Sequence, residues 1–510
     1  MNFIDYAILI LYLFFTLILG AWVGRRQGNT EDYFLAGCRM KWWPVAISLF
    51  ASLFSAISYI AMPGEAYNHG CNLALGGLTG VIALPVMLFV FLKFFYHMRL
   101  FTVNEYLEKR FDNSIRLLVG ALFMVLRFVY LGVMFYATGL LLQNALGWSP
   151  WMSILLIGVF TTIYTYLGGM EAIIWTDVAQ FVVMTGGVLV IIGFVAWQML
   201  GGLAGVWEFA AENGRTFDLS PSSGVWSWDL MQRISFWMIL LSVPFAMITP
   251  ATDQTNLQRC MTCRNFKEVA RAVSASTLAN LPICLLFYFA GLCIFAYFKS
   301  LHPELDDPAR GGDIAFVQFI SSELPVGLRG FLVAGLLAAV MSSVDSVINS
   351  IAAVFIKDLY QPKLAPGRDE KHYIKASGIA SLGIGLASCL VGILVWLIFT
   401  GRDIPLVEVT NISLGVLGAF STGIFVTALL TYRTNGAGIW IGLAVCVPVT
   451  LAVTIFGYLL QPREERIGFL FLITLPIFLE IAVAYIASFF IGGNREDSRN
   501  YVIWSRWFKK

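Results

Sequence analysis

The chain has 510 residues, of which 58% are hydrophobic and only 13% are charged. A water-soluble domain carries roughly 25% charged residues, so the composition excludes an ordinary soluble protein and indicates a polytopic membrane protein. The formal net charge of +2 is too small to suggest a nucleic-acid partner.

Thirteen apolar stretches are long enough to cross a bilayer as helices, which takes about 20 residues each. They fall at 4–23, 43–67, 75–96, 113–145, 150–168, 171–200, 232–250, 270–298, 327–357, 374–400, 405–431, 437–460 and 467–492. We therefore expect an all-α polytopic membrane protein that forms one transmembrane domain over residues 1–510.

Basic residues alternate between the connecting segments. Of the 33 Lys and Arg residues, 23 lie in segments 24–42, 97–116, 251–271, 357–376, 432–436 and 493–510, whereas the intervening segments are poorer in them and mostly acidic. Cytoplasmic loops carry an excess of Lys and Arg, so we expect the N-terminus outside and the C-terminus in the cytoplasm. An odd number of spans requires the same arrangement. The predicted location is the plasma or inner membrane.

Two spans carry residues that break helices. Ser55 and Ser58 are followed by Pro63-Gly64 in the second span, and Pro244 and Pro250 interrupt the seventh. Backbone freed by such residues is tolerated in a membrane where it lines a cavity or is re-satisfied. The two spans are five apart, which predicts inverted repeats that each open with a discontinuous helix. The expected divisions are 1–42 (an extra first helix and loop), 43–200 and 230–431 (the repeats), 437–492 (two further helices) and 493–510 (a tail).

The span around residues 331–360 carries a polar stripe. Ser342, Asp345, Ser346 and Asn349 fall at i, i+3, i+4 and i+7, so they share one helical face. Cross-helix packing would explain the serines. It does not explain a carboxylate at mid-membrane depth, which normally faces a partner, a cavity or an ion. We interpret this helix as the lining of a cation site.

A second intramembrane carboxylate follows a predicted turn. Gly168-Gly169 makes a tight turn possible, and Asp177 lies about two helical turns into the next span. It is either an interfacial carboxylate in water or a partner of the stripe that holds Asp345.

Four stretches together resemble the sodium:solute symporter family. They are SLFASLFSAISYIAMPGEAY at 48–67, NEYLEKRF at 104–111, GGMEAIIWTDVAQ at 168–180 and AAVMSSVDSVINS at 338–350. The resemblance covers nearly the whole chain and implies a leucine-transporter-like 5+5 inverted repeat, with about 13 transmembrane helices. It also implies Na⁺-coupled symport of a small organic solute by alternating access, with Na⁺ as the coupling ion and no organic cofactor.

The resemblance implies positions for the sodium ligands. The shared site would use the carbonyls of Ala51, Phe54 and Ala339 and the hydroxyls of Ser342 and Ser343. These are oxygen ligands, which hard cations favour.

A second sodium site in some family members maps onto Asp177, Ser342, Asp345 and Ser346. The position of Asp345 is often Ser or Thr in sugar and sialic-acid transporters. With Asp177 it places two carboxylates near one site, so either they share a cation or one of them holds a proton.

The substrate contacts implied by position are Ser55, Ser58, Gly77, Tyr130 and Pro250, with Arg127 one turn before Tyr130. Arg127 either binds a substrate carboxylate or pairs with an acidic residue. The solute would be a sugar, a sialic acid or a related polyol or carboxylate. The alternatives are a monocarboxylate or vitamin transporter, an ion channel and a transporter-like sensor. We expect a monomer in the lipid bilayer and no enzymatic activity.

Overall fold

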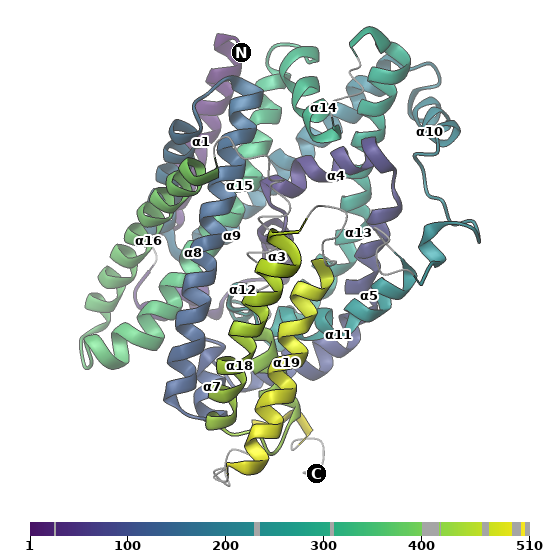
Figure 1. Ribbon diagram of the computed structural model, residues 1–510. Coiled ribbons are helices and arrows are strands. Elements are labelled where there is room, and N and C mark those ends of the chain that lie inside the picture. Colours follow the sequence, from purple (N-terminus) through teal and green to yellow (C-terminus); the bar gives the residue numbers. More distant parts are fainter. Residues whose placement is uncertain are drawn as a thin grey trace.

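The structure is a computed structural model that describes residues 1–24, 27–228, 235–305, 311–399, 418, 420–461, 469–491 and 501–504, and these ranges contain helices and no β-strand (Figure 1). The first half comprises α1 (Phe3–Val23), α2 (Thr30–Leu35), α3 (Trp42–Leu53), α4 (Ala56–His69), α5 (Leu78–Val86), α6 (Lys93–His97), α7 (Asn104–Arg110), α8 (Asn113–Leu146), α9 (Pro150–Gln198) and α10 (Gly202–Glu212). The second half comprises α11 (Phe236–Thr252), α12 (Gln254–Met261), α13 (Phe266–Ala296), α14 (Gly312–Gln318), α15 (Leu328–Val354), α16 (Glu370–Phe399), α18 (Gly436–Thr454) and α19 (Phe469–Phe490).

The described helices match most of the predicted spans. Eight segments are long and apolar enough to cross a membrane, and the bent pair α3–α4 makes a ninth. The predicted spans 150–168 and 171–200 both belong to α9, which is broken at Gly169 (φ 54°, ψ −156°), at the predicted glycine turn. Most of the predicted span 405–431 and most of the tail 493–510 lie outside the described residues. The number thirteen therefore stays a prediction.

The second span is discontinuous, but its break precedes the predicted proline. Helix α3 ends at Leu53, α4 begins at Ala56, and the two axes differ by 65°. Pro63 lies inside α4, where its carbonyl packs so closely on α13 that a Cβ at Gly291 would come within 2.2 Å of it. Gly291 thus gives room to the continuous helix α4. The predicted discontinuity of the second span is confirmed, and it lies between Leu53 and Ala56 rather than at Pro63-Gly64.

The seventh span also breaks later than its prolines suggest. Helix α11 runs through Pro244 and Pro250 to Thr252, and α12 begins after Asp253, whose side chain caps the amide of Asn256 at 3.1 Å. Near Pro250, the Thr249 and Thr252 hydroxyls donate to the carbonyls of Phe245 and Ile248, at 2.9 and 3.2 Å. Pro250 removes the amide that would bond to the Ala246 carbonyl, yet α11 continues past it to Thr252. The break therefore lies at an N-cap residue and not at the prolines.

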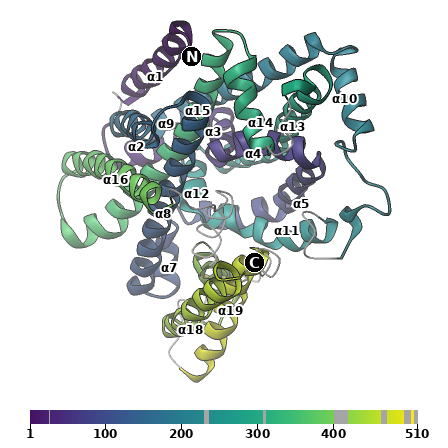
Figure 2. The ribbon, with the colours of Figure 1, turned by 45° about the horizontal axis from the view of Figure 1, so that its top comes forward.

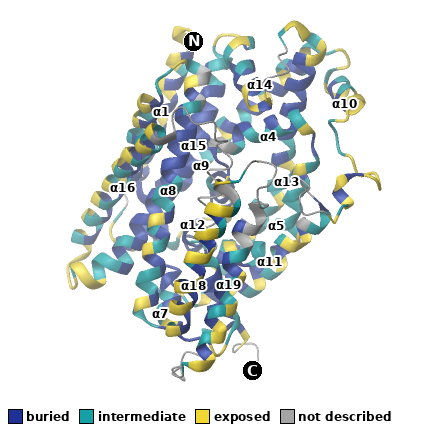
Figure 3. Cartoon of the chain, viewed as in Figure 1, coloured by how far each residue is buried: buried dark blue, intermediate teal, exposed yellow. Residues whose placement is uncertain are grey.

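Helix α15 forms the centre of the molecule. It contacts α1, α3, α4, α8, α9, α12 and α16, and every residue from Leu332 to Val354 is buried (Figures 2 and 3). Helices α18 and α19 instead pack on each other at the edge of the molecule (Figure 2). The predicted polar stripe is therefore surrounded by protein on all sides, which is the setting that intramembrane polar groups require.

Candidate functional site

The first group of predicted ligands meets where α3 ends. The Ser342 hydroxyl donates to the Ala51 carbonyl at 3.1 Å and lies 3.2 Å from the Ala339 carbonyl. The Ser343 hydroxyl donates to the same Ala339 carbonyl at 3.4 Å. All four residues are buried. A hydrogen bond thus joins the end of α3 to the middle of α15, and several oxygen atoms lie together at this point.

Phe54, the remaining predicted ligand, lies between the two helices α3 and α4. Its backbone is extended (φ −91°, ψ 92°), and the amide of Ser58 bonds to the Ser55 side chain at 3.3 Å. The Phe54 carbonyl consequently lies outside the hydrogen-bond ladders of α3 and α4. Carbonyl and hydroxyl oxygens without a formal charge can bind a hard cation through its oxygen preference.

A second polar cluster contains a complete ion pair. Asp177 Oδ2 accepts from Ser48 Oγ at 2.5 Å and from the Arg259 guanidinium at 3.3 Å. Arg259 Nε also donates to Ser48 Oγ at 2.8 Å, and its Nη2 donates to Ser346 Oγ. The side chains of Asp177 and Arg259 are fully buried. Asp177 is therefore not an interfacial carboxylate in water, and that interpretation is wrong.

Asp345 adjoins this cluster and is held by hydroxyl groups. Tyr164 Oη donates to Asp345 Oδ2 at 2.6 Å, and Ser346 Oγ lies 3.0 Å from Oδ1. Ser346 is thus shared between Asp345 and Arg259. Together the buried groups hold two carboxylates and one guanidinium. If both carboxylates are ionised, the cluster has one uncompensated negative charge, which another cation or a proton can neutralise.

The sodium:solute symporter family model matches residues 33–446. The chain belongs to the sodium:solute symporter family. Its relatives couple solute movement to sodium, so this protein is a sodium-coupled solute symporter of the membrane and not an enzyme.

Two bacterial relatives align with this symporter over most of both chains. It is 29% identical to the sodium/sialic acid symporter SiaT of Proteus mirabilis, over 88% of this chain and 89% of the relative. It is 30% identical to the sodium/sialic acid symporter NanT of Aliivibrio fischeri, over 91% and 94%. The human sodium/iodide cotransporter is also 30% identical, over 90% of this chain and 71% of its own.

Solved structures confirm the predicted fold class. A Na⁺-coupled sialic acid symporter in a substrate-bound outward-open state superposes with a TM-score of 0.85 at 26% identity, covering 97% of this chain and 99% of that one. Mhp1, a nucleobase-cation-symport-1 family transporter, superposes with a TM-score of 0.53 at 15% identity over 92% and 98% of the two chains, a likeness of fold alone.

Sequence reasoning missed Ser48, Tyr164 and Arg259 as members of the symporter's site. Arg259 is one of the basic residues of segment 251–271, which the charge pattern predicts to be a cytoplasmic loop. In the structure that segment contains α12, whose residues from Gln254 to Met261 are all buried except Asn256. The available signal was Asp253 as an N-cap, followed by apolar side chains at Leu257 and Met261.

The predicted substrate residues of the symporter form separate groups. Ser55 and Ser58 adjoin each other, with 3.4 Å between their hydroxyls. Gly77 packs on α13, where a Cβ would lie 3.3 Å from the Leu281 side chain. Pro250 lines a cavity of about 200 Å³ beside α3, α11, α12 and α13. Contacts alone therefore do not assemble these residues into one binding site.

Arg127 of the symporter has an acidic partner. It forms an ion pair with Asp253, the residue at the break between α11 and α12, and its guanidinium carbon lies 5.8 Å from the centre of the Tyr130 ring. Both members of the pair are partly exposed, at 17% and 18% of their side chains. Of the two alternatives for Arg127, a substrate carboxylate or an acidic residue of the protein, this conformation shows the second. A substrate carboxylate would compete with Asp253.

The NEYLEKRF stretch has a structural role in the symporter. Asn104 and Arg116 both donate to the buried Asp358 carboxylate, at 2.8 and 2.6 Å, and Thr102 donates to it at 2.8 Å. Arg110 donates to the carbonyls of Ala428 and Thr431, at 3.2 and 2.6 Å. These bonds tie α7 and α8 to the segment after α15 and to residues near 430.

Proposed function

We propose that this symporter imports a sialic acid or a related acidic sugar, driven by Na⁺. The observation that carries the proposal is the likeness to a Na⁺-coupled sialic acid symporter, with a TM-score of 0.85 over nearly the full length of both chains. The two bacterial sialic acid relatives also match over most of their lengths. We propose further that the protein is a monomer whose N-terminus is outside and whose C-terminus is cytoplasmic.

A monocarboxylate or vitamin substrate is the second candidate. A sodium-dependent multivitamin transporter from rabbit is 30% identical and human sodium-coupled monocarboxylate transporter 1 is 28% identical, but this chain covers only 68% and 73% of them. Each of these substrate classes includes carboxylates, which Arg127 could bind in place of Asp253. The identities alone do not separate the two classes, so the first experiment compares them directly.

We assign the coupling Na⁺ to the oxygens of Ala51, Phe54, Ala339, Ser342 and Ser343. Ala51 and Phe54 belong to the predicted repeat 43–200, and the other three ligands belong to the predicted repeat 230–431. Ser342 already bonds to the Ala51 carbonyl, so a contact between the two repeats is present. A Na⁺ ion held by ligands from both α3 and α15 would draw the break between α3 and α4 toward α15. Because Ser55 and Ser58 follow that break directly, this approach would order the start of α4, where we place part of the substrate cavity.

The predicted second cation site, at Asp177 and Asp345, already contains the positive charge of the Arg259 guanidinium. The Arg259 guanidinium bonds to Asp177 and Ser346, two of the four residues predicted to hold a second sodium. We propose that Arg259 acts as the cation of Asp177 in this conformation. Asp345 is then the carboxylate that would admit a second Na⁺ or a proton.

The substrate experiment is a thermal-shift screen of the purified protein. Sialic acids, neutral sugars, polyols and monocarboxylates are added in Na⁺ and in choline buffer, because a ligand of the folded state raises apparent stability. We expect a sialic acid to give the largest shift, and only in Na⁺. By linkage, calorimetry should show the same factor for sodium tightening the substrate and substrate tightening sodium. Equal substrate affinity in both buffers contradicts coupling, and a larger shift with monocarboxylates selects the second candidate.

Uptake into proteoliposomes then separates transport classes. Saturable solute uptake that requires a sodium gradient distinguishes a symporter from an ion channel or a sensor. The direction of transport is tested together with the orientation of the protein in the membrane. Proteolysis of the tail at 493–510, with the protease added on either side, checks that orientation.

The Asp345→Asn variant tests the second site. It removes a negative charge but keeps an oxygen ligand, so we expect uptake to persist with a lower Hill coefficient or weaker apparent affinity for sodium. Loss of the pH dependence of uptake at unchanged sodium stoichiometry would identify a proton carrier instead. Asp358→Asn is the control, because its carboxylate is buried in a structural network and the variant should lose stability only. If Asp345→Asn also loses stability only, Asp345 is a structural residue.

A further inference from the structure

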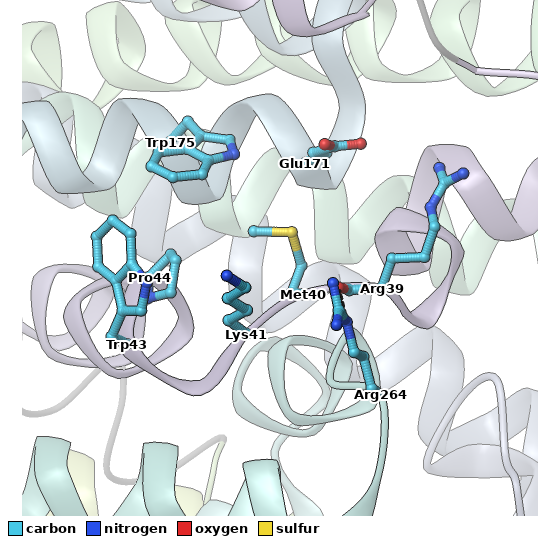
Figure 4. Close-up of a pocket in the computed structure, with 8 residues that line it drawn as sticks. All are labelled: Arg39, Met40, Lys41, Trp43, Pro44, Glu171, Trp175 and Arg264. Atoms are coloured by element: carbon cyan, nitrogen blue, oxygen red, sulfur yellow. Dashed lines mark hydrogen bonds between the residues drawn. The ribbon is translucent and has the colours of Figure 1, made fainter.

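A basic cavity lies away from the sodium and substrate groups. It has a volume of about 360 Å³ and opens between the start of α3 and the part of α9 that follows Gly169 (Figure 4). Its lining consists of Arg39, Met40, Lys41, Trp43, Pro44, Glu171, Trp175 and Arg264. Three of these side chains are cationic and one is anionic, so the lining carries an excess of positive charge.

The cations of this cavity are only partly neutralised. Arg39 pairs with Asp32 at 3.0 Å. Arg264 donates its Nε to the Arg39 carbonyl at 2.8 Å (Figure 4), which leaves its terminal nitrogens for another acceptor. In the described part of the chain, neither Lys41 nor Arg264 forms an ion pair, and both residues are exposed. The cavity therefore presents two cationic groups that can take an external anion.

Two tryptophans place the cavity at the boundary of the bilayer. The Trp43 and Trp175 rings meet edge to face with 5.4 Å between their centres, and Trp is enriched at membrane–water interfaces. Along α9, Trp175 is followed at seven-residue steps by Val182 and Leu189, which are 62% and 53% exposed. This spacing keeps the three residues on one side of the helix. An apolar, outward-facing track thus leads from the cavity toward the middle of the bilayer.

We propose that the cavity binds the phosphodiester headgroup of an anionic phospholipid, such as phosphatidylglycerol, with an acyl chain along Val182 and Leu189. Arg and Lys bind phosphate oxygens through charge-assisted hydrogen bonds. Basic pockets between membrane helices bind lipid headgroups by the same chemistry. The Glu171 carboxylate, on the opposite wall from Lys41 in Figure 4, can accept a hydrogen bond from a headgroup hydroxyl. The inference rests on neither the sodium nor the substrate assignment.

Lipid binding can be measured by native mass spectrometry of the full chain. The detergent-purified protein is titrated with phosphatidylglycerol, phosphatidylethanolamine and phosphatidylcholine. We expect phosphatidylglycerol to bind most tightly. The double variant Lys41→Gln/Arg264→Gln should bind it about thirtyfold more weakly, since each of the two cations contributes about fivefold to the affinity. The matched control Lys371→Gln/Lys375→Gln removes two exposed cations from α16 and should bind it as the wild type does.

A variant that binds the lipid more tightly shows that the weaker binding of the double variant is not caused by a folding defect. Glu171→Gln removes the one negative charge of the lining but keeps an oxygen that can accept from the headgroup hydroxyl, so phosphatidylglycerol should bind it about fivefold more tightly. Equal affinity for the three lipids, an unaffected Lys41→Gln/Arg264→Gln variant or an equally weakened control would overturn the proposal. Glycerophosphoglycerol and inorganic phosphate are tested separately. If either binds as tightly as the whole lipid, the cavity is a site for a free anion and the lipid assignment is wrong.

Discussion

Arg259→Gln is expected to destabilise the protein strongly and to make its stability depend on sodium. The substitution removes the partner of Asp177, and both side chains are fully buried. Breaking a buried ion pair by removing one member costs about 3–5 kcal/mol. Asp177 and Asp345 would then lack a fixed cation. Added Na⁺ should therefore raise the melting temperature of the variant much more than that of the wild type, relative to choline.

Two further variants separate this effect from a general loss of folding. Asp177→Asn combined with Arg259→Gln removes both charges, so it should recover part of the lost stability and lose the added sodium dependence. Arg271→Gln removes an exposed arginine that pairs with Glu268 on α13 and should leave both quantities unchanged. A double variant as unstable as Arg259→Gln, with the same sodium dependence, would contradict the proposed role of Arg259.

Ser342→Ala and Ser343→Ala should each weaken sodium activation of uptake. A hydrogen-bonding oxygen that contacts a charged group contributes about 1.5–3 kcal/mol, so the half-activating sodium concentration should rise about tenfold to hundredfold. Folding should survive because Ala is a good helix former. The Ala51 carbonyl also keeps its bond from the Phe54 amide at 3.2 Å. The measurement is initial uptake against sodium concentration in proteoliposomes.

Ser350→Ala is the matched control for these variants. Ser350 is buried on the same helix, and its hydroxyl donates to the Ser346 carbonyl within the helix at 2.7 Å. Its removal should leave sodium activation unchanged. Wild-type sodium activation in both Ser342→Ala and Ser343→Ala would show that the coupling ion binds elsewhere.

Local patterns predicted the features of this fold that depend on one helix. The polar stripe of α15 follows from helical spacing alone. The structure places Asp345 and Ser346 in one polar cluster and Ser342 against the end of α3. The turn at Gly169 follows from the need for a residue that tolerates positive φ. Span boundaries are equally local, because about 20 apolar residues suffice to define each one.

Features that depend on contacts between distant segments could not be predicted in this way. Pro63 and Pro250 look like breaks in the sequence, but both lie inside helices, α4 and α11. Arg259 looks like one more loop cation. Its burial requires α12 to fold against α3 and α15, which neither charge counting nor hydropathy reports. The pairing of Arg127 with Asp253 is likewise a contact between segments 126 residues apart.

The complete enclosure of α15 has a consequence for how the protein is made. Ala51, Tyr164 and Arg259, the groups that bond to its polar stripe from other helices, all precede it in the chain. When the ribosome delivers α15 to the membrane, its acceptors and donors have therefore already been synthesised. Among the long helices that the structure describes in contact with α15, α16 alone is made later. Asp345 thus needs no prolonged exposure to lipid during biogenesis. Helix α15 can pack directly against the helices that were synthesised before it.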